Sequence, residues 1–266
     1  MTFDLPLAHL YLFLFVVARV AGVVLVAPGF GSGSLPGRLR ALLVLALSLL
    51  IAPLQSAAHV AQPENLGQLA WLSGNELGVG IILGFGVNLV FVSAQLAGQV
   101  IGQMSGMQAA DVFNPTLGTS VPLFAQLIDS MLLIVFVAIG GHQLVIGALL
   151  DPFVRMPVTQ VRWEAGTIET LVALLGESFA LGLKIGAPIT VTMLVSLLVL
   201  GLISRSLPQL NLMQIGFSLN SLLTLLVLSV TLGGSLVWFD EQVFRSVDLL
   251  RERLTGGATA IADASS

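Results

Sequence analysis

The chain has 266 residues, of which 56% are hydrophobic and only 9% are charged, and its formal net charge is −4. A soluble domain carries about 25% charged residues, so this composition indicates a membrane protein or a subunit of a large apolar assembly, and it argues against a soluble enzyme. The chain has only 10 basic residues and no cysteine, which excludes a nucleic-acid-binding surface, disulfides, thiolate zinc sites and iron–sulfur clusters.

Six apolar segments follow one another along the chain. They cover residues 7–27, 39–54, 77–106, 121–150, 168–203 and 212–239. The charges between them are sparse: 34 uncharged residues separate Glu76 from Asp111, and another 34 separate Arg205 from Asp240. A helix needs about 20 apolar residues to cross a bilayer core, so the sequence predicts an all-α, polytopic membrane protein with about six long helices. Some segments exceed one span, and we expect these helices to tilt, kink or fold back into hairpins.

The arginines in the predicted loops do not define an orientation. With six simple spans, one side of the membrane holds five of them and the other three: Arg155, Arg162, Arg245, Arg251 and Arg253 against Arg38, Arg40 and Arg205. This asymmetry is too small for the positive-inside rule to decide. Either partner proteins set the orientation, or the helices do not cross the bilayer conventionally.

The C-terminal part divides into an amphipathic stretch and a tail. Val243, Val247, Leu250 and Leu254 fall on one helical face within residues 240–254. We expect a partner-facing or interfacial helix there, the alternative being a terminal helix that lies on its own protein. Residues 1–255 are predicted to form a single helical domain, and residues 256–266 a disordered tail.

Small residues recur at every fourth position in two of the segments, which places them on one helical face. They are Gly98, Gly102 and Gly106 in the first set, and Ser178, Gly182 and Gly186 in the second. Such faces let helix backbones approach closely in apolar surroundings. They predict tight helix packing, either within this chain or between chains of an oligomer.

A polar stripe runs along the segment that holds the first glycine set. Asn88, Gln95, Gln99 and Gln103 are spaced by seven, four and four residues and share one helical face. Amides facing hydrocarbon are unfavourable unless they bond a neighbour or meet water. The stripe therefore predicts either hydrogen bonds to a neighbouring helix or a surface facing an aqueous lumen.

Four charged residues lie within or at the margins of the apolar segments: Arg19, Asp129, Glu177 and Lys184. Glu177 and Lys184 are seven residues apart and could serve one polar crevice, while Arg19 and Asp129 could pair across helices. Structural ion pairs and the coupling charges of a transporter both fit this pattern. No H-E-x-x-H, G-x-S-x-G or P-loop sequence is present, so the chain has no enzyme signature.

Several blocks of sequence carry a resemblance to a known family. They are Ala27-Pro28-Gly29-Phe30, Leu35-Pro36-Gly37-Arg38-Leu39-Arg40, Gly98-Gln99-Val100-Ile101-Gly102 leading to Asn114-Pro115, and Ser204-Arg205-Ser206-Leu207-Pro208-Gln209-Leu210-Asn211. Over residues 5–250 the chain resembles the FliR family of flagellar export-gate proteins, whose counterpart in virulence type III secretion is SctT. The stretch 27–40 favours the flagellar family. The family often has aspartate at the position of Asn114, which here carries no charge.

The resemblance implies a non-enzymatic subunit of the flagellar type III export gate, without a cofactor. Such a subunit sits in the bacterial inner membrane within the flagellar basal body, assembles with FliP and FliQ, contacts FlhB and passes unfolded flagellar proteins. It also implies a plug loop, for which adaptable apolar side chains are suited. The candidate plug residues are Met104, Met107, Val112, Phe113, Asn114 and Pro115. The alternatives are an ordinary packed loop at this place and, for the whole chain, an SctT-type subunit, a secondary transporter or a membrane scaffold.

Overall fold

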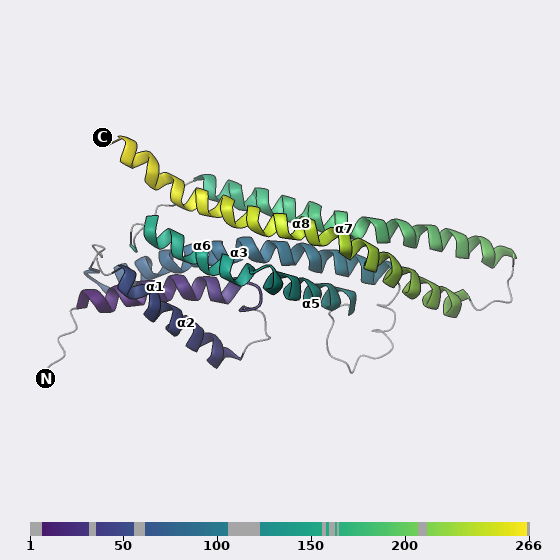
Figure 1. Cartoon of the computed structure of the whole chain (residues 1–266), viewed down its shortest axis with the longest axis horizontal. Coiled ribbons are helices and arrows are strands. Elements are labelled where there is room, and N and C mark those ends of the chain that lie inside the picture. Colours follow the sequence, from purple (N-terminus) through teal and green to yellow (C-terminus); the bar gives the residue numbers. More distant parts are fainter. Residues whose placement is uncertain are drawn as a thin grey trace. The chain divides into compact units, whose positions relative to one another are not determined.

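A computed structural model describes residues 7–31, 36–55, 62–105, 123–155, 158–159, 163, 165–206 and 212–264 (Figure 1). The helices are α1 (Leu7–Val26), α2 (Gly37–Ile51), the short 3-10 helix η1 (Ala52–Gln55), α3 (Leu66–Met104), α5 (Leu123–Ala138), α6 (Gly141–Arg155), α7 (Ala165–Ser206) and α8 (Leu212–Ala264). The described residues contain no strand. The predicted all-α fold is confirmed, and each predicted apolar segment lies largely in helix.

Four of the described helices are long and apolar enough to cross a membrane: α1, α2 with η1, α3 and α7. Helices α5 and α6 form a bent pair, and counting them as one broken span gives five at most. The bend falls at Gly140, whose φ of 77° suits a residue without a Cβ. The prediction of about six apolar helices is therefore approximate. Segment 121–150 is two short helices rather than one long one, and the apolar part of α8 among the described residues, Ile215–Thr231, is shorter than a span.

The beginning of α3 is set by side chains rather than by the apolar run. The side-chain oxygen of Asn65 accepts the backbone N–H of Gln68 at 2.8 Å, and the Gln68 side chain accepts the N–H of Glu64 at 2.9 Å. This reciprocal arrangement satisfies N–H groups that the first helical turn leaves open. The helix consequently starts at Leu66, well before the predicted residue 77.

The chain separates into two compact units. Unit 1 comprises residues 1–89, 140–174 and 243–266, and unit 2 comprises residues 90–139 and 175–242. Helices α3, α7 and α8 each contribute residues to both units. The single domain expected over residues 1–255 stays a prediction, and the helix segments are grouped in two compact clusters.

In unit 1, α1 packs against the first half of α3 through glycines on both helices. A methyl group at Gly22 would overlap the backbone of Leu77, and one at Gly80 would overlap the carbonyl of Arg19. A methyl group at Gly84 would come within 2.9 Å of the carbonyl oxygen of Val23. Only glycine permits so close a crossing of two helix backbones, so these positions fix how α1 lies on α3.

The last part of α8 also packs within unit 1. Val243, Val247 and Leu250 are buried, and the side chain of Leu250 fills the space that a Cβ on Gly86 would need. These three residues therefore lie on their own protein, in agreement with the alternative interpretation of this face. The helix continues to Ala264, past the predicted start of a disordered tail at residue 256, because alternating alanines favour helix after Gly256 and Gly257.

Helix α2 is the least covered of the candidate spans. Only Ser48 and Ile51 are buried on it, and a row of leucines is exposed: Leu39, Leu42, Leu45, Leu49 and Leu50. A helix that is apolar around most of its circumference needs an apolar environment. This exposure supports a membrane protein.

In unit 2, α7 and the first part of α8 pair along their length, and Figure 1 shows the two ribbons running alongside each other. Ser196 donates a hydrogen bond of 2.7 Å to Asn220, and the hydroxyl of Thr224 lies 3.6 Å from the sulfur of Met193. Phe91 meets Phe136 and Phe239 edge to face, with ring centroids 5.4 and 5.5 Å apart. These contacts join α3, α5 and α8 inside the unit.

Candidate functional site

Helices α3 and α5 come into close contact in unit 2 and bring polar residues together. A methyl group at Gly98 would overlap the backbone of Ala125, so the two backbones nearly touch there. One turn away, the side-chain amide of Gln95 donates a hydrogen bond of 3.0 Å to Oδ1 of Asp129. The glycine thus allows the approach that places Gln95 and Asp129 within reach of each other.

The amide stripe of α3 continues onto α5. Gln95, Gln99 and Gln103 are exposed, and Asn88, which belongs to unit 1, is partly exposed. On α5, Gln126 and Ser130 are exposed and Asp129 is half-buried. The name polar strip is used below for the unit 2 residues Gln95, Gln99, Gln103, Gln126, Asp129 and Ser130. Most of the other exposed side chains of unit 2 are apolar, so the polar strip is the surface of this unit best suited to water.

The predicted packing glycines are buried where the structure describes them. A methyl group at Gly182 of α7 would lie 2.6 Å from the carbonyl oxygen of Ser93 on α3, and one at Gly186 would lie 3.9 Å from Cα of Ala97. Gly98 has its close neighbour on α5, Gly102 is buried, and Gly106 lies outside the described residues. Packing inside the chain accounts for Gly98 and Gly182.

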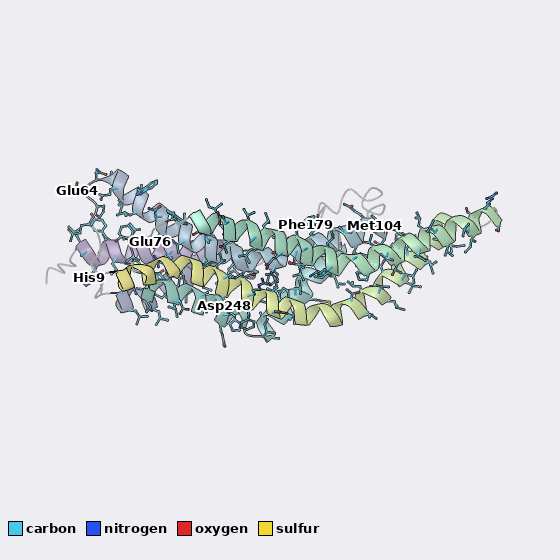
Figure 2. The ribbon with its side chains drawn as sticks, turned by 90° about the horizontal axis from the view of Figure 1, so that it is seen from above. His9, Glu64, Glu76, Met104, Phe179 and Asp248 are labelled. Atoms are coloured by element: carbon cyan, nitrogen blue, oxygen red, sulfur yellow. The ribbon has the colours of Figure 1, made fainter. Side chains whose placement is uncertain are left out.

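The candidate plug begins at the end of α3. Met104 is the last residue of this helix and is 42% exposed (Figure 2). Ser105 follows it, buried, with its hydroxyl bonded to the carbonyl oxygen of Gly102 at 3.0 Å. The other candidates, Met107, Val112, Phe113, Asn114 and Pro115, lie outside the described residues.

Arg19 pairs with Glu76, so the predicted pairing of Arg19 with Asp129 is wrong. Both Nε and Nη2 of Arg19 lie 2.6 Å from Oε2 of Glu76, and both side chains are fully buried. The other carboxylate oxygen accepts the N–H of Thr159 at 2.7 Å, and the guanidinium lies 4.4 Å from the ring centre of Phe153. Glu76 therefore ties together α1, α3 and the connection that follows α6.

Sequence reasoning missed Glu76 because it stands at the edge of an uncharged run and looked like a loop residue. A signal was nevertheless present. A buried arginine in an apolar helix needs an acidic partner, and few acidic residues lie near the ends of the apolar segments.

Glu177 and Lys184 differ in their surroundings, although their spacing predicted one shared crevice. Glu177 accepts a hydrogen bond of 3.1 Å from the side chain of Gln242, whereas Lys184 is exposed on α7. The described residues contain no group of three or more His, Asp or Glu side chains that could hold a metal ion. The site thus presents amide side chains, one hydroxyl and one carboxylate.

The sequence profile described as "Bacterial export proteins, family 1" matches residues 10–246. The chain belongs to this family. It is similar to the flagellar biosynthetic protein FliR of Caulobacter vibrioides, with 28% identity over 88% of this chain and 93% of that protein. Against FliR of Escherichia coli K12 the identity is 29% over 80% of this chain and 81% of the relative. Against FliR of Pectobacterium carotovorum it is 29% over 89% and 90%.

These matches confirm the resemblance to the FliR family that the sequence blocks indicated. The matched region includes every residue of the polar strip and both residues of the buried ion pair. Neither the family description nor the names of these relatives denotes an enzyme.

Proposed function

We propose that this chain is a non-enzymatic subunit of the flagellar type III protein export gate. With FliP and FliQ it forms the channel through which unfolded flagellar proteins leave the cell, in contact with FlhB, in the inner membrane at the basal body. The names of the similar proteins and the export family support this role. The apolar helices support a place in a membrane or a large apolar assembly.

The observation that carries the proposal is the polar strip. Only 9% of the residues are charged, so polar surface is scarce, yet several amide side chains lie together on adjoining faces of α3 and α5. Amides need water or hydrogen-bond partners, whereas lipid offers neither. A surface along an aqueous passage meets this need, and an unfolded polypeptide with its free peptide groups requires a passage of this kind.

The passage must close when no substrate occupies it, and Met104 stands where the closing segment begins. Methionine is flexible and packs against irregular surroundings, so residues 104–115 can fill a lumen and yield to a passing chain. Removing a buried apolar side chain weakens packing by about 2–5 kcal/mol. About 1.4 kcal/mol shifts an equilibrium between closed and open states tenfold.

The test is ion conductance of the assembled gate. The gate is produced with FliP and FliQ in membranes, with Met104, Met107 and Phe113 replaced by alanine, singly and together. We expect the triple variant to leak small ions while FliP and FliQ still co-purify. Met131→Ala is the matched control, since Met131 is 43% exposed on α5 and lies outside the candidate plug. A triple variant that assembles and conducts no more than the wild type would show that closure lies elsewhere.

Assembly and the flagellar assignment have their own tests. The chain expressed alone should be poorly behaved, because exposed apolar helices such as α2 need partners or lipid. A stable, monodisperse monomer in detergent would count against the gate. Restoration of swimming in a strain that lacks its FliR would support the flagellar role, whereas restoration of secretion only in a needle-complex mutant would favour the SctT role.

A further inference from the structure

Asp129 is the one carboxylate of the polar strip, and its partner there is neutral. Gln95 donates to its Oδ1 at 3.0 Å. The salt bridge between Arg19 and Glu76 does not involve Asp129. The basic residues of the described part of unit 2 are Lys184 and Arg205, both exposed on α7.

The neighbours of Asp129 on the polar strip are uncharged, so they leave the negative charge of its carboxylate in place. Gln99 and Gln126 carry uncharged amides, and the hydroxyl of Ser130 donates to the backbone carbonyl of Gln126 at 2.8 Å. Gln95 holds one carboxylate oxygen in place through its amide. A fixed negative charge therefore stands on a surface otherwise made of neutral dipoles.

Resting on the proposed function, which places the polar strip along the export lumen, we infer that Asp129 gives the lumen wall a preference for cations. The cations concerned are small hydrated ions and the lysine and arginine side chains of a passing chain. Carboxylates that line a pore favour cations because they attract positive charge and repel negative charge. The effect is local, since physiological salt screens a charge beyond about 8 Å.

The chain has no cysteine, so a single introduced thiol reports on the strip without interference from this subunit. Gln99→Cys is placed in the gate assembled with FliP and FliQ. It is treated with a trimethylammonium thiosulfonate and, separately, with a sulfonate-bearing thiosulfonate of similar size. Each reaction rate is divided by the rate of the same reagent with a free thiol in solution. On this scale we expect the cationic reagent to react faster than the anionic one. Asp129→Asn should lower the ratio of the cationic to the anionic rate about three- to tenfold, as one nearby charge in hydrated surroundings implies.

Asp129→Asn keeps an oxygen that can accept from Gln95, so the variant removes the charge and preserves the shape. Ser206→Cys, exposed at the end of α7, is the control position, and its ratio should not respond to Asp129→Asn. An unchanged ratio at Gln99→Cys would overturn the inference alone. The inference would also be overturned if neither reagent reacts with the thiol of Gln99→Cys although the plug variant of the same gate leaks ions. Loss of FliP and FliQ from the purified wild-type complex would overturn the proposed function, and the inference with it.

Discussion

The guanidinium of Arg19 and the carboxylate of Glu76 form an ion pair with 2.6 Å between Nη2 and Oε2, and neither side chain is exposed at all. The pair joins α1 to α3 across 57 residues of sequence. It is extended by the N–H of Thr159, a residue whose φ of 73° is rare for a side chain with a branched β-carbon. One carboxylate thus compensates a buried cation and stabilises a left-handed turn.

Breaking this pair from either side should destabilise the protein strongly. Arg19→Met leaves the carboxylate of Glu76 buried without its cation, and Glu76→Gln leaves the guanidinium of Arg19 without its anion. We expect each single variant to lose about 3–5 kcal/mol, and the double variant to recover a large part of that loss because no lone charge remains. The measurement is resistance to thermal aggregation and proteolysis of the purified complex.

Glu64→Gln is the control for this series. Glu64 is exposed before α3, and the group that bonds Gln68 is its backbone N–H rather than its carboxylate. Its stability should match that of the wild type. Single variants as stable as Glu64→Gln would mean that the buried pair contributes little.

Two glycines of α3 offer a matched test of the crossing with α1. A methyl group at Gly80 would overlap the backbone carbonyl of Arg19, whereas one at Gly74 would meet nothing within 4 Å. Gly74→Ala should be neutral or stabilising by up to about 1 kcal/mol, because alanine favours helix. Gly80→Ala should lower stability and accumulation in the membrane. Equal accumulation of the two variants would contradict the close approach.

The contact between Glu177 and Gln242 holds α7 to α8 within unit 2. Gln242→Ala removes the amide donor and should destabilise the protein by about 1–2 kcal/mol, the usual range for a hydrogen bond to a charged group. Glu241→Gln, at an exposed neighbouring position, should have no effect. The two variants are compared by thermal unfolding of the purified complex. A loss of stability with Glu241→Gln and none with Gln242→Ala would contradict the contact between Glu177 and Gln242.

Substitutions on the two faces of the last part of α8 should have different effects, one on the stability of the chain and the other on gate assembly. Leu250 is 1% exposed and packs against Gly86, whereas Phe244 is 42% exposed. Leu250→Ala should lower the stability of the chain itself by about 2–5 kcal/mol. Truncation after Thr255 should be silent, and truncation after Trp238 should weaken gate assembly. If Phe244→Ala weakens co-purification of FliP and FliQ but not stability, the exposed face is the one that meets a partner.

The apolar segments were predictable because uncharged runs of this length are typical of membrane helices, and α1, α2, α7 and the apolar parts of α3 and α8 follow them closely. The start of α3 was not predictable from hydropathy, because Glu76 looked like the end of a loop. A buried Glu76 is compatible with a helix only because Arg19 compensates its charge. The Asn65 and Gln68 cap was readable as a helix start, but it lies in a polar stretch that hydropathy assigned to a loop.

The amide stripe was predicted as a shared face, and Gln95, Gln99 and Gln103 are exposed together as expected from their spacing. The extension of the stripe onto α5 was not predicted, because the helix that packs against α3 depends on where Gly98 permits close approach. Periodicity describes one helix at a time. The pairing of Asp129 with Gln95 rather than with Arg19 is a property of two helices, which a single periodic pattern does not contain.

The distance in sequence between Arg19 and Glu76 has a consequence for biosynthesis. The ribosome makes α1 with its arginine long before it makes the glutamate that compensates it, 57 residues later. A lone arginine near the centre of a helix opposes insertion by about 2.5–3.5 kcal/mol. We therefore expect the membrane insertion of α1 to be delayed until α3 has been synthesised, so that both helices enter the bilayer together. Chains stalled before Leu66 should leave α1 accessible from the cytoplasm, chains stalled after Met104 should not, and Arg19→Leu should abolish the difference.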